Sequence, residues 1–225
     1  MRFRFLLLAG MLAACGGQDV RGTQPPPVTD WNSDPRPLGK TLVYECADYE
    51  FVARIGPGEM AVWLDDRYMI LSQVRAASGV KYQEGDTEFW MKGDEASLLL
   101  DGQRFTGCQL NPSRAPWEDA RRRAVDFRAV GNEPGWHLEI QSGRQLLFVF
   151  DYGMQRVLVA DPGAQQVEDG RIYHAVEEGN DLRVEISDKA CVDTMKVDTF
   201  PSSVMLHLNG VEYRGCGMEL EHPWE

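Results

Sequence analysis

The sequence is short of basic residues and has no long hydrophobic run. Its 225 residues include 23 Lys or Arg against 35 Asp or Glu, which gives a net charge of −12. A surplus of acid of this size argues against nucleic acid and anionic lipid headgroups as partners, because both are polyanions. The apolar run at 5–12 is too short to cross a bilayer as a helix. The composition favours a basic partner, although excess acid can also serve only to keep a chain soluble.

Motifs for metal binding and hydrolysis are absent from the sequence. No C-x-x-C, H-E-x-x-H or G-x-S-x-G occurs, and His137, His174, His207 and His222 have no metal-ligand spacing. A triad of Asp193 with one histidine could still assemble in space, but structural histidines are the simpler expectation. We therefore expect no enzyme, no cofactor and no metal site.

The first fourteen residues are typical of a secretory signal. Two arginines, the short apolar run and the small pair Ala13-Ala14 follow one another in the order that such a signal requires. The segment Leu12-Ala13-Ala14-Cys15 resembles the bacterial lipobox, in which the cysteine is acylated, for example with palmitate, and becomes the first mature residue. Several acyl chains on Cys15 would anchor the protein stably. Gly16 in place of Asp implies the outer membrane, with the protein facing the periplasm; an ordinary cleaved signal is the alternative.

The remaining cysteines form an even set, which an oxidising compartment would pair. Cys46, Cys108, Cys191 and Cys216 allow three connectivities. We prefer Cys46 with Cys108 and Cys191 with Cys216, because each pair then brackets one candidate domain. Closing the longer loop would restrict the unfolded chain by about 4 kcal/mol.

Changes in composition divide the chain into five parts. We expect a signal peptide at 1–14, a flexible Pro-rich tether at 15–37, a first domain at 38–111, a linker at 112–123 and a β-rich second domain at 124–225. A short helical turn is expected at 118–125. The linker arginines Arg121, Arg122 and Arg123 are expected to form a solvated face.

Both domains are predicted to be all-β. Short alternating segments bounded by turn residues indicate strands. In the first domain they occupy 42–46, 51–55, 61–64, 68–73, 80–83, 87–91, 96–100 and 103–108. Eight strands at this spacing favour a small closed barrel or a sandwich. In the second domain they occupy 127–130, 136–140, 145–151, 155–160, 172–176, 182–187, 204–208 and 211–216, which favours a second small antiparallel barrel or sandwich.

The two domains end in similar segments. "LDGQRFTGC" at 100–108 and "LNGVEYRGC" at 208–216 share the spacing of their turn and their cysteine. Asp-Gly at Asp101-Gly102 predicts a tight hairpin, because both central residues of a type I′ turn have positive φ. We interpret the pair as one closing hairpin used twice, not as a full repeat.

The stretch "SGVKYQEGDTEFWMKGDEASLLL" at 78–100 carries an unusual combination. Ser78-Gly79, Tyr82, Phe89-Trp90, Lys92-Gly93 and Glu95 lie between a Tyr44-x-Cys46 start and Cys108. A lysine beside aromatics is most often a solvated charge at a sheet edge. The whole pattern, however, resembles the MliC/PliC family of bacterial inhibitors of c-type lysozyme over about 42–108. The resemblance implies an eight-stranded antiparallel barrel closed by a disulfide.

The resemblance also implies roles for individual residues. Ser78 and Lys92 would enter the lysozyme cleft, with Gly79 and Tyr82 beside them in the lysozyme-binding set. Phe89, Trp90, Gly93 and Glu95 would support the loop, a role that also suits Tyr82. The protein would then be an envelope lipoprotein that protects peptidoglycan from host lysozyme.

A rival interpretation remains at this point. The barrel could be a non-inhibitory envelope module that binds a small ligand or a cell-wall fragment. The second domain, with "GNEPGW", "CVDTM" and "YRGCG", resembles an uncharacterised bacterial envelope domain, and that resemblance implies no mechanism.

Overall fold

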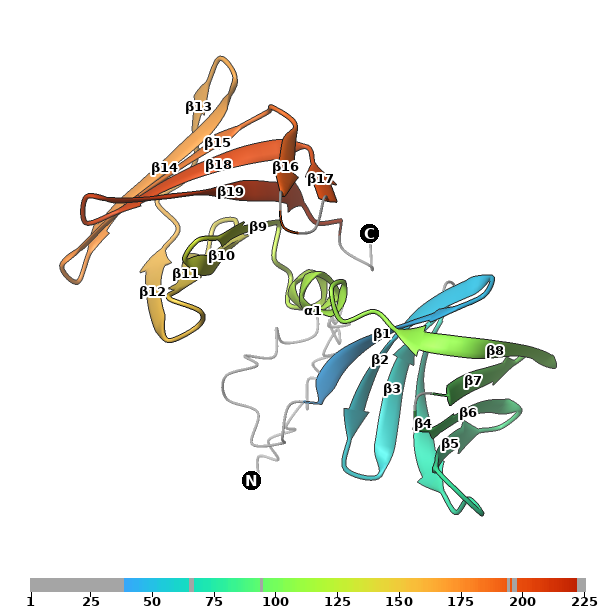
Figure 1. Ribbon diagram of the computed structural model, residues 1–225. Helices are drawn as coiled ribbons and strands as arrows, with labels where there is room; N and C mark the ends of the chain where they lie inside the picture. The colour runs from blue at the N-terminus through green and yellow to red at the C-terminus, as the bar shows by residue number, and fades with distance from the viewer. Residues whose placement is uncertain (1–38, 65–66, 94, 194, 196–197, 222–225) are drawn as a thin grey trace, which may run out of the picture. The chain divides into compact units, whose positions relative to one another are not determined.

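The computed structural model describes residues 39–64, 67–93, 95–193, 195 and 198–221, and these are almost entirely β-strands (Figure 1). The predicted signal, the lipobox cysteine Cys15 and the tether lie outside the described residues. Within the described ranges, no helix combines the length and the apolar character needed to cross a membrane.

The first eight strands form a closed antiparallel barrel. Each strand pairs with its neighbours in chain order, and the barrel closes where Tyr44 of the first strand lies opposite Leu110 of the last. The strands are β1 (Lys40–Cys46), β2 (Tyr49–Gly56), β3 (Glu59–Trp63), β4 (Tyr68–Val74), β5 (Val80–Glu84), β6 (Thr87–Lys92), β7 (Glu95–Leu100) and β8 (Gln103–Leu110). The prediction of an all-β fold with an eight-stranded antiparallel barrel is confirmed.

Alternating large apolar side chains fill the barrel, as the period-2 pattern requires. Tyr44, Phe51 and Phe89 meet at its centre, with the Tyr44 ring 5.3 Å from that of Phe51 and 4.9 Å from that of Phe89. A disulfide between Cys46 and Cys108 lies in the same core and joins the first strand to the last. The barrel is therefore closed by the hydrogen bonds between β1 and β8 and also by a covalent bridge.

One helix, α1 (Ala115–Arg122), follows the barrel. It begins three residues earlier than predicted, because Pro116 is compatible with the first turn of a helix. The expectation of a solvated arginine face is wrong for Arg122, which is 8% exposed and binds the Glu118 carboxylate at 2.6 Å. The Arg123 side chain is 29% exposed and binds Glu139 at 2.7 Å. Acidic partners that are distant in sequence or one helical turn away therefore bind both guanidinium groups.

The rest of the chain forms one curled antiparallel sheet of nine strands and a two-stranded hairpin (Figure 1). The sheet order is β12-β11-β10-β9-β19-β18-β15-β14-β13. Its strands are β9 (Phe127–Asn132), β10 (Gly135–Gln141), β11 (Gln145–Phe150), β12 (Gln155–Ala160), β13 (Gln165–Val167), β14 (Gly170–Glu177), β15 (Asn180–Ser187), β18 (Ser202–Leu208) and β19 (Val211–Glu219). The hairpin consists of β16 (Cys191–Asp193) and β17 (Asp198–Phe200).

The second domain is all-β and antiparallel, as predicted. It takes the form of one curled sheet, in which β12 and β13 end the strand order without pairing to each other. Three strands, β13, β16 and β17, were not predicted. Each has only three residues, which is too short for an alternating pattern to be visible in the sequence.

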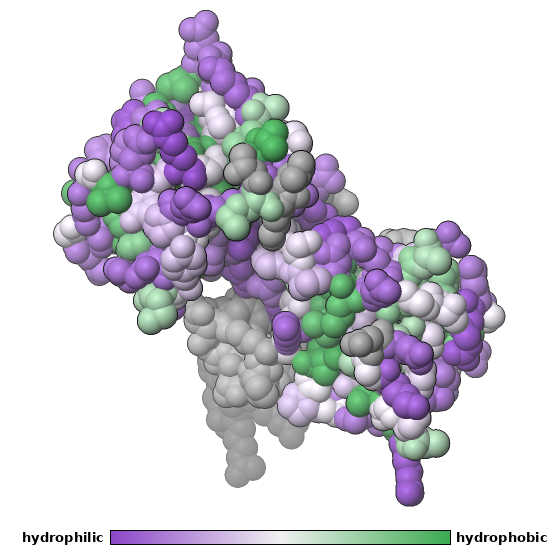
Figure 2. Space-filling model, in the orientation of Figure 1, coloured by the Kyte–Doolittle hydropathy of each residue, from purple (hydrophilic) through white to green (hydrophobic). Residues whose placement is uncertain are grey.

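The predicted closing hairpin is confirmed at both places. Asp101 and Gly102 have φ of 50° and 80°, and Asn209 and Gly210 have φ of 50° and 85°. The structure also contains the two bridges of the sequential pairing, the second one between Cys191 and Cys216. On the face drawn in Figure 2, hydrophilic residues dominate and apolar residues appear in separate small groups.

Candidate functional site

The predicted loop residues meet at one end of the barrel. Ser78 and Gly79 lie in the loop between β4 and β5, and Lys92 is the last residue of β6. Val80 pairs with Met91 across the two strands, so the residues just before Val80 lie beside the one just after Met91. Ser78, Gly79 and Lys92 are all exposed.

Gly79 brings the two segments into close contact. A Cβ atom at this position would lie 2.2 Å from the Met91 carbonyl oxygen and 3.0 Å from the Lys92 Cβ. Its φ of +72° is also one that side chains rarely adopt. No other residue type fits here without displacing β6, so the glycine is what allows the loop that carries Ser78 to approach the end of β6.

Trp90 fixes the loop from the outer face of the barrel. Phe89 and Met91 point toward the core, so Trp90 and Lys92 share the outer face of β6. The Trp90 indole Nε1 donates a hydrogen bond to the Ser78 carbonyl oxygen at 3.0 Å. The loop carrying Ser78 is thus tied to the same strand that carries Lys92.

Tyr82 and Phe89 belong to the barrel core. They pair across β5 and β6 and are 4% and 0% exposed. Tyr44 lies in the same core. Burial, and to a smaller extent the neighbouring Tyr82, raises the pKa of the Tyr44 hydroxyl to about 12. The Tyr82 side chain points into the barrel core, which suits the predicted supporting role better than a direct contact with lysozyme.

Gly93 and Glu95 belong to the turn that follows Lys92. Gly93 has a φ of +58°, and Glu95 is the cross-strand partner of Lys92 at the start of β7. Both residues are exposed. The turn therefore presents Lys92 at the very end of a two-strand ribbon.

A shallow pocket of about 400 Å³, which we call the rim pocket, adjoins these residues. Ser78 and Trp90 contribute to its wall, together with three cationic side chains, Arg75, Lys81 and Arg104. Its one carboxylate, Glu88, binds Lys81 at 2.6 Å and lies 3.8 Å from Arg104. This end of an acidic barrel is therefore locally positive.

Sequence reasoning did not find Arg75 and Arg104 as part of this site. Arg75 precedes the loop, and Arg104 lies on β8, where it pairs with Leu99 of β7. The signal available in the sequence was the alternation of β8, which places Arg104 on the outer face. Only the strand register brings it beside Trp90.

The described residues show no group of three His, Cys, Asp or Glu side chains that could hold a metal ion.

The exposed Ser78 and Lys92 have a hydroxyl and an ammonium to offer a partner. Such a pair can enter a cleft and form hydrogen bonds there.

Comparison with known proteins places the barrel in a family. The family model described as the membrane-bound lysozyme inhibitor of c-type lysozyme, MliC, matches residues 44–105. The membrane-bound lysozyme inhibitor of C-type lysozyme from Escherichia coli K12 is 35% identical over 78 residues, which cover 33% of this chain and 72% of that protein. The chain belongs to the MliC family.

A second MliC relative extends the comparison. The protein of the same name from Yersinia enterocolitica is 35% identical over 68 residues, 29% of this chain and 58% of that protein, so less than two thirds of its length is matched. No solved structure matches the chain significantly. Both MliC relatives are named as inhibitors of an enzyme, not as enzymes. The family model ends before α1, so the curled sheet lies outside the match.

Proposed function

We propose that this chain inhibits c-type lysozyme by inserting Lys92, with Ser78 beside it, into the catalytic cleft. The observation that carries the proposal is the close approach of Gly79 to the Met91 carbonyl and to Lys92, which leaves no room for a Cβ at position 79. This close approach supports a placement of Ser78 and Lys92 side by side at an exposed end of the barrel. Both residues lie within the part of the chain that matches the MliC family.

The chemistry of the target suits an inserted lysine. Lysozyme of this type works with two carboxyl groups, one protonated in an apolar pocket and one ionised. An ammonium group can donate to both, and a hydrogen bond to a charged group contributes about 1.5 to 3 kcal/mol. Ser78 can donate or accept a further bond in the same cleft.

The structure also limits the entropy that binding would cost. Trp90 holds the Ser78 carbonyl, and the strand register fixes the backbone of Lys92 opposite Glu95. A loop that is already ordered before association loses less conformational freedom when it binds. More of the binding free energy from the proposed Lys92 contacts would therefore remain in the net affinity.

Charge would guide the encounter in two stages. Residues 38–111 carry seven Lys or Arg and twelve Asp or Glu, a net charge of −5. That field attracts a basic enzyme and weakens with added salt. The cations around the rim pocket would then face the acidic cleft, so the inhibitor would dock with this end first.

We also propose the location and the division of the chain. Cys15 would carry the lipid that anchors the mature protein in the outer membrane, facing the periplasm, and both relatives are named as membrane-bound. Residues 38–111 and 124–225 would be two domains joined by 112–123. Replacing Cys15 with Ala should abolish labelling with radioactive palmitate and release the protein from membranes; retained labelling would exclude acylation at Cys15.

The test of inhibition compares two lysine variants of the full chain. Lys92→Ala should weaken inhibition of c-type lysozyme by about 2 to 5 kcal/mol, because the carboxyl groups of the enzyme would stay buried without their partner. Lys40→Ala is the matched control, because it removes the same charge from β1, which is separated from β5 and β6 by other strands in both directions. Inhibition constants from a cell-wall lysis assay give the comparison.

Two results would reject the proposal. Equal inhibition constants for Lys92→Ala and Lys40→Ala would show that Lys92 does not enter the cleft. A wild-type chain that binds no c-type lysozyme would favour a non-inhibitory envelope-binding module.

A further inference from the structure

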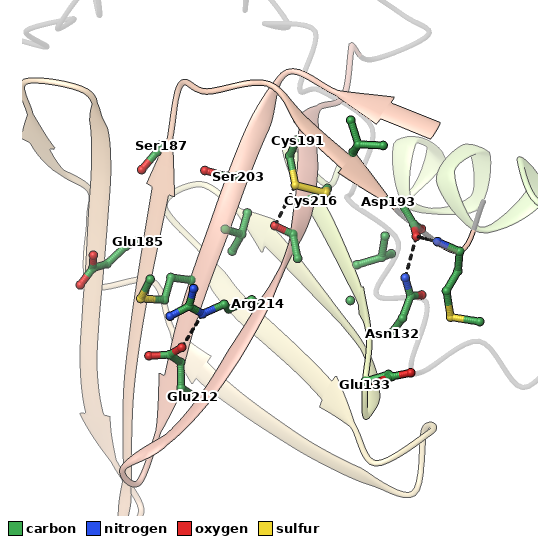
Figure 3. A pocket seen from close by; sticks show the side chains of 17 residues that line it. Asn132, Glu133, Glu185, Ser187, Cys191, Asp193, Ser203, Glu212, Arg214 and Cys216 are labelled. Atoms are coloured by element: carbon green, nitrogen blue, oxygen red, sulfur yellow. Dashed lines mark hydrogen bonds and ion pairs between the residues drawn. A yellow bond between two sulfur atoms is a disulfide. The ribbon is translucent and has the colours of Figure 1, made fainter. Parts of the chain in front are cut away.

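The curled sheet has a pocket of about 650 Å³ on its outer face, and we call it the outer-face pocket (Figure 3). Core residues of β15, β18 and β19, such as Val184, Leu206 and Tyr213, point to the other side of the sheet. Their neighbours therefore point outward. A cavity of this volume is in the range of small-molecule sites.

The floor of the outer-face pocket consists of two rows of side chains across the sheet. Glu185, Met205 and Arg214 are cross-strand neighbours in one row. Ser187, Ser203, Cys216 and Val130 follow in the other. The floor thus combines polar and apolar side chains in each row.

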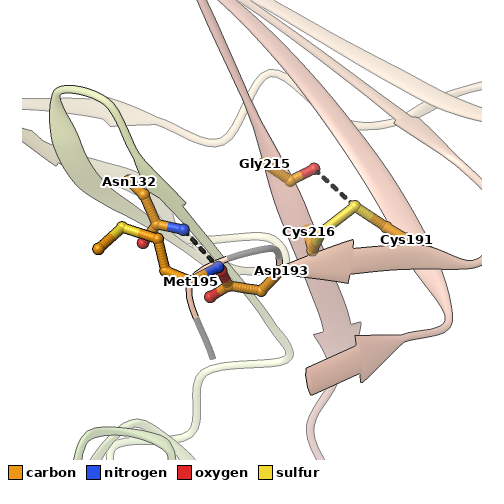
Figure 4. The surroundings of a disulfide bond; sticks show 6 residues. All are labelled: Asn132, Cys191, Asp193, Met195, Gly215 and Cys216. Atoms are coloured by element: carbon orange, nitrogen blue, oxygen red, sulfur yellow. Dashed lines mark hydrogen bonds between the residues drawn. A yellow bond between two sulfur atoms is a disulfide. The ribbon is translucent and has the colours of Figure 1, made fainter. Parts of the chain in front are cut away.

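The β16 strand forms a wall over this floor and is held there at two points. A disulfide joins Cys191 to Cys216 of β19, and the Asn132 side-chain amide donates to Asp193 Oδ1 at 2.6 Å (Figure 4). One bond is covalent and the other is short and partly buried. The wall is therefore built into the fold and does not depend on a ligand.

Asp193 offers an unused acceptor to the outer-face pocket. Its side chain lines the pocket, and the residue is only 6% exposed. The backbone N–H of Met195 and the Asn132 amide both donate to Oδ1, and no described residue donates to Oδ2. This second carboxylate oxygen is therefore free to accept a hydrogen bond from a group bound in the outer-face pocket.

The lining of the outer-face pocket is also strongly acidic. It contains four carboxylates, of Glu133, Glu185, Asp193 and Glu212, and one guanidinium, of Arg214, which binds Glu212. In Figure 3, Glu185 and Glu212 lie on one side of the pocket and Glu133 and Asp193 on the other. Within the described part of the chain, these acids do not form a group that could hold a metal ion. The lining therefore suits a cationic group, and the separation of its acids suits an organic cation better than a metal ion.

We propose that the outer-face pocket binds an alkylammonium or alkylguanidinium group, with its cationic end on Asp193 and its aliphatic stem over Val130, Met205 and the Cys191–Cys216 bridge. A linear diamine matches the separated acids, because each end then meets a carboxylate. The same chemistry is offered by a free diamine and by the Lys or Arg side chain of a basic protein. The inference is independent of lysozyme inhibition.

The test titrates the full chain with 1,5-diaminopentane and, as a neutral analogue of equal length, with 1,5-pentanediol. Calorimetry should show diamine binding with a dissociation constant of about 1 mM or lower, at least about 10-fold tighter than the diol. The Asn132 side-chain amide signal in a nitrogen–proton correlation spectrum should shift on binding, because this group contacts Asp193. A lysine-containing peptide titrated in parallel distinguishes the two sources by its relative affinity.

Three variants test which residues bind the diamine. Asp193→Asn should weaken diamine binding by about 10- to 100-fold, because the new amide keeps an oxygen for Asn132 and Met195 but presents a donor to the ammonium. Glu133→Gln should weaken it by a smaller factor. Glu168→Gln, which removes the same charge from an exposed position outside the pocket lining, should leave it unchanged.

Several outcomes would overturn the proposal. They are absence of heat and of any Asn132 shift at about 10 mM diamine, equal affinity for the diol, or equal affinity in the Asp193→Asn and Glu168→Gln variants. Tight binding of Ca²⁺ that displaces the diamine would also overturn it, since the site would then be a metal site.

Discussion

The barrel and the curled sheet end in closely similar segments, yet the cysteine of each segment faces a different side of its sheet. Leu100 and Phe105 point into the barrel, and so does Cys108. In the curled sheet Leu208 and Tyr213 point into the core, but Cys216 lies on the outer face, where it lines the outer-face pocket. The spacing from leucine to cysteine is the same in both.

A single extra residue in the strand explains the difference. On β8 the register shifts, so that Leu98 pairs with Phe105 but Ala96 pairs with Cys108. Gly107 lies in this bulge with a φ of +65°. On β19 the pairing with β18 runs without a shift. One inserted residue moves every later side chain to the opposite face.

The two disulfides consequently have different structural roles. Cys46–Cys108 lies inside the barrel and joins its first and last strands. Cys191–Cys216 attaches a short hairpin to the outside of a sheet and so builds a pocket wall. A shared cysteine pattern therefore predicts a bridge, but it does not predict what the bridge encloses.

Buried charge also separates the two regions. Among the described residues, all the buried charged side chains lie outside the barrel strands; they are Glu118, Arg122, Arg128, Glu139 and Asp193. The barrel core is apolar apart from hydroxyl-bearing residues, Tyr44 and Tyr82 among them, and none of the described charged side chains of the barrel strands is buried. The stability of the barrel should therefore depend on packing, and that of the curled sheet on ion pairing as well.

Removing the barrel disulfide should have the largest effect. Replacing Cys46 and Cys108 together with Ala should lower the free energy of unfolding of the barrel by about 4 kcal/mol, because the bridge closes a loop with a sequence separation of 62. Replacing Cys191 and Cys216 should expose mainly the hairpin to solvent. Amide hydrogen exchange resolved by segment measures both. Equal loss of protection throughout the two regions would contradict the difference in their roles.

Breaking the buried ion cluster should destabilise the curled sheet. Glu139 is 3% exposed and binds both Arg123 and Arg128. Glu139→Gln should lower the free energy of unfolding by about 3 kcal/mol, because the Arg128 charge stays buried without a counter-charge. Asp101→Asn, which removes a carboxylate that is 62% exposed on the barrel surface and binds Arg67, should lower it by less than about 1 kcal/mol. Denaturant titration gives both values, and similar losses would refute the contrast.

Alanine at the two equivalent glycines, Gly107 of β8 and Gly215 of β19, should lower the free energy of unfolding by different amounts. At Gly215 a Cβ would lie 2.1 Å from the Val130 carbonyl oxygen and 2.7 Å from the Trp136 ring. Gly215→Ala should therefore force β9 and β19 apart and lower the free energy of unfolding by about 2 to 3 kcal/mol. Gly107→Ala meets open space and costs only the strained φ, about 1 kcal/mol. If Gly107→Ala is the more destabilising in thermal unfolding, this explanation fails.

Mild acid should affect the curled sheet through His137, while the barrel segment contains no histidine. Burial, followed by the charges of Arg128 and Arg123, lowers the pKa of His137 from 6.5 to about 4. As pH falls from 6.5 toward 4, His137 binds a proton in the unfolded chain but not in the folded chain, so the free energy of unfolding decreases. His137→Gln should flatten this slope in urea unfolding curves recorded across that range. An unchanged slope would assign the acid sensitivity to other groups.

Much of the barrel could be predicted from the sequence. The alternation of apolar residues identified all eight strands, and Asp101-Gly102 identified the last turn, because both signals are local. The motif around Ser78 and Lys92 was visible for the same reason. The inward direction of Tyr82 and the cations Arg75 and Arg104 were not identified, because they depend on which strands are neighbours.

Less of the curled sheet could be predicted. Glu139 and Arg128 lie in segments that alternate as an ordinary surface strand would, and nothing local marks them as a buried pair with Arg123. The strands β16 and β17 have three residues each and carry no periodic signal. The wall of the outer-face pocket was therefore absent from any inference made from the sequence.

The sequence by itself determined most of the strand content, the turn types, the even number of cysteines left to pair and the acidic charge, since each depends on residues within one element or on simple counting. Tertiary structure alone decided the face on which each residue lies and the neighbours it meets. The reason is that a register shift of one residue, as at Gly107, reverses a whole strand end and depends on packing contacts across the sheet. For Cys108 and Cys216 that choice separates a closed core from an open pocket.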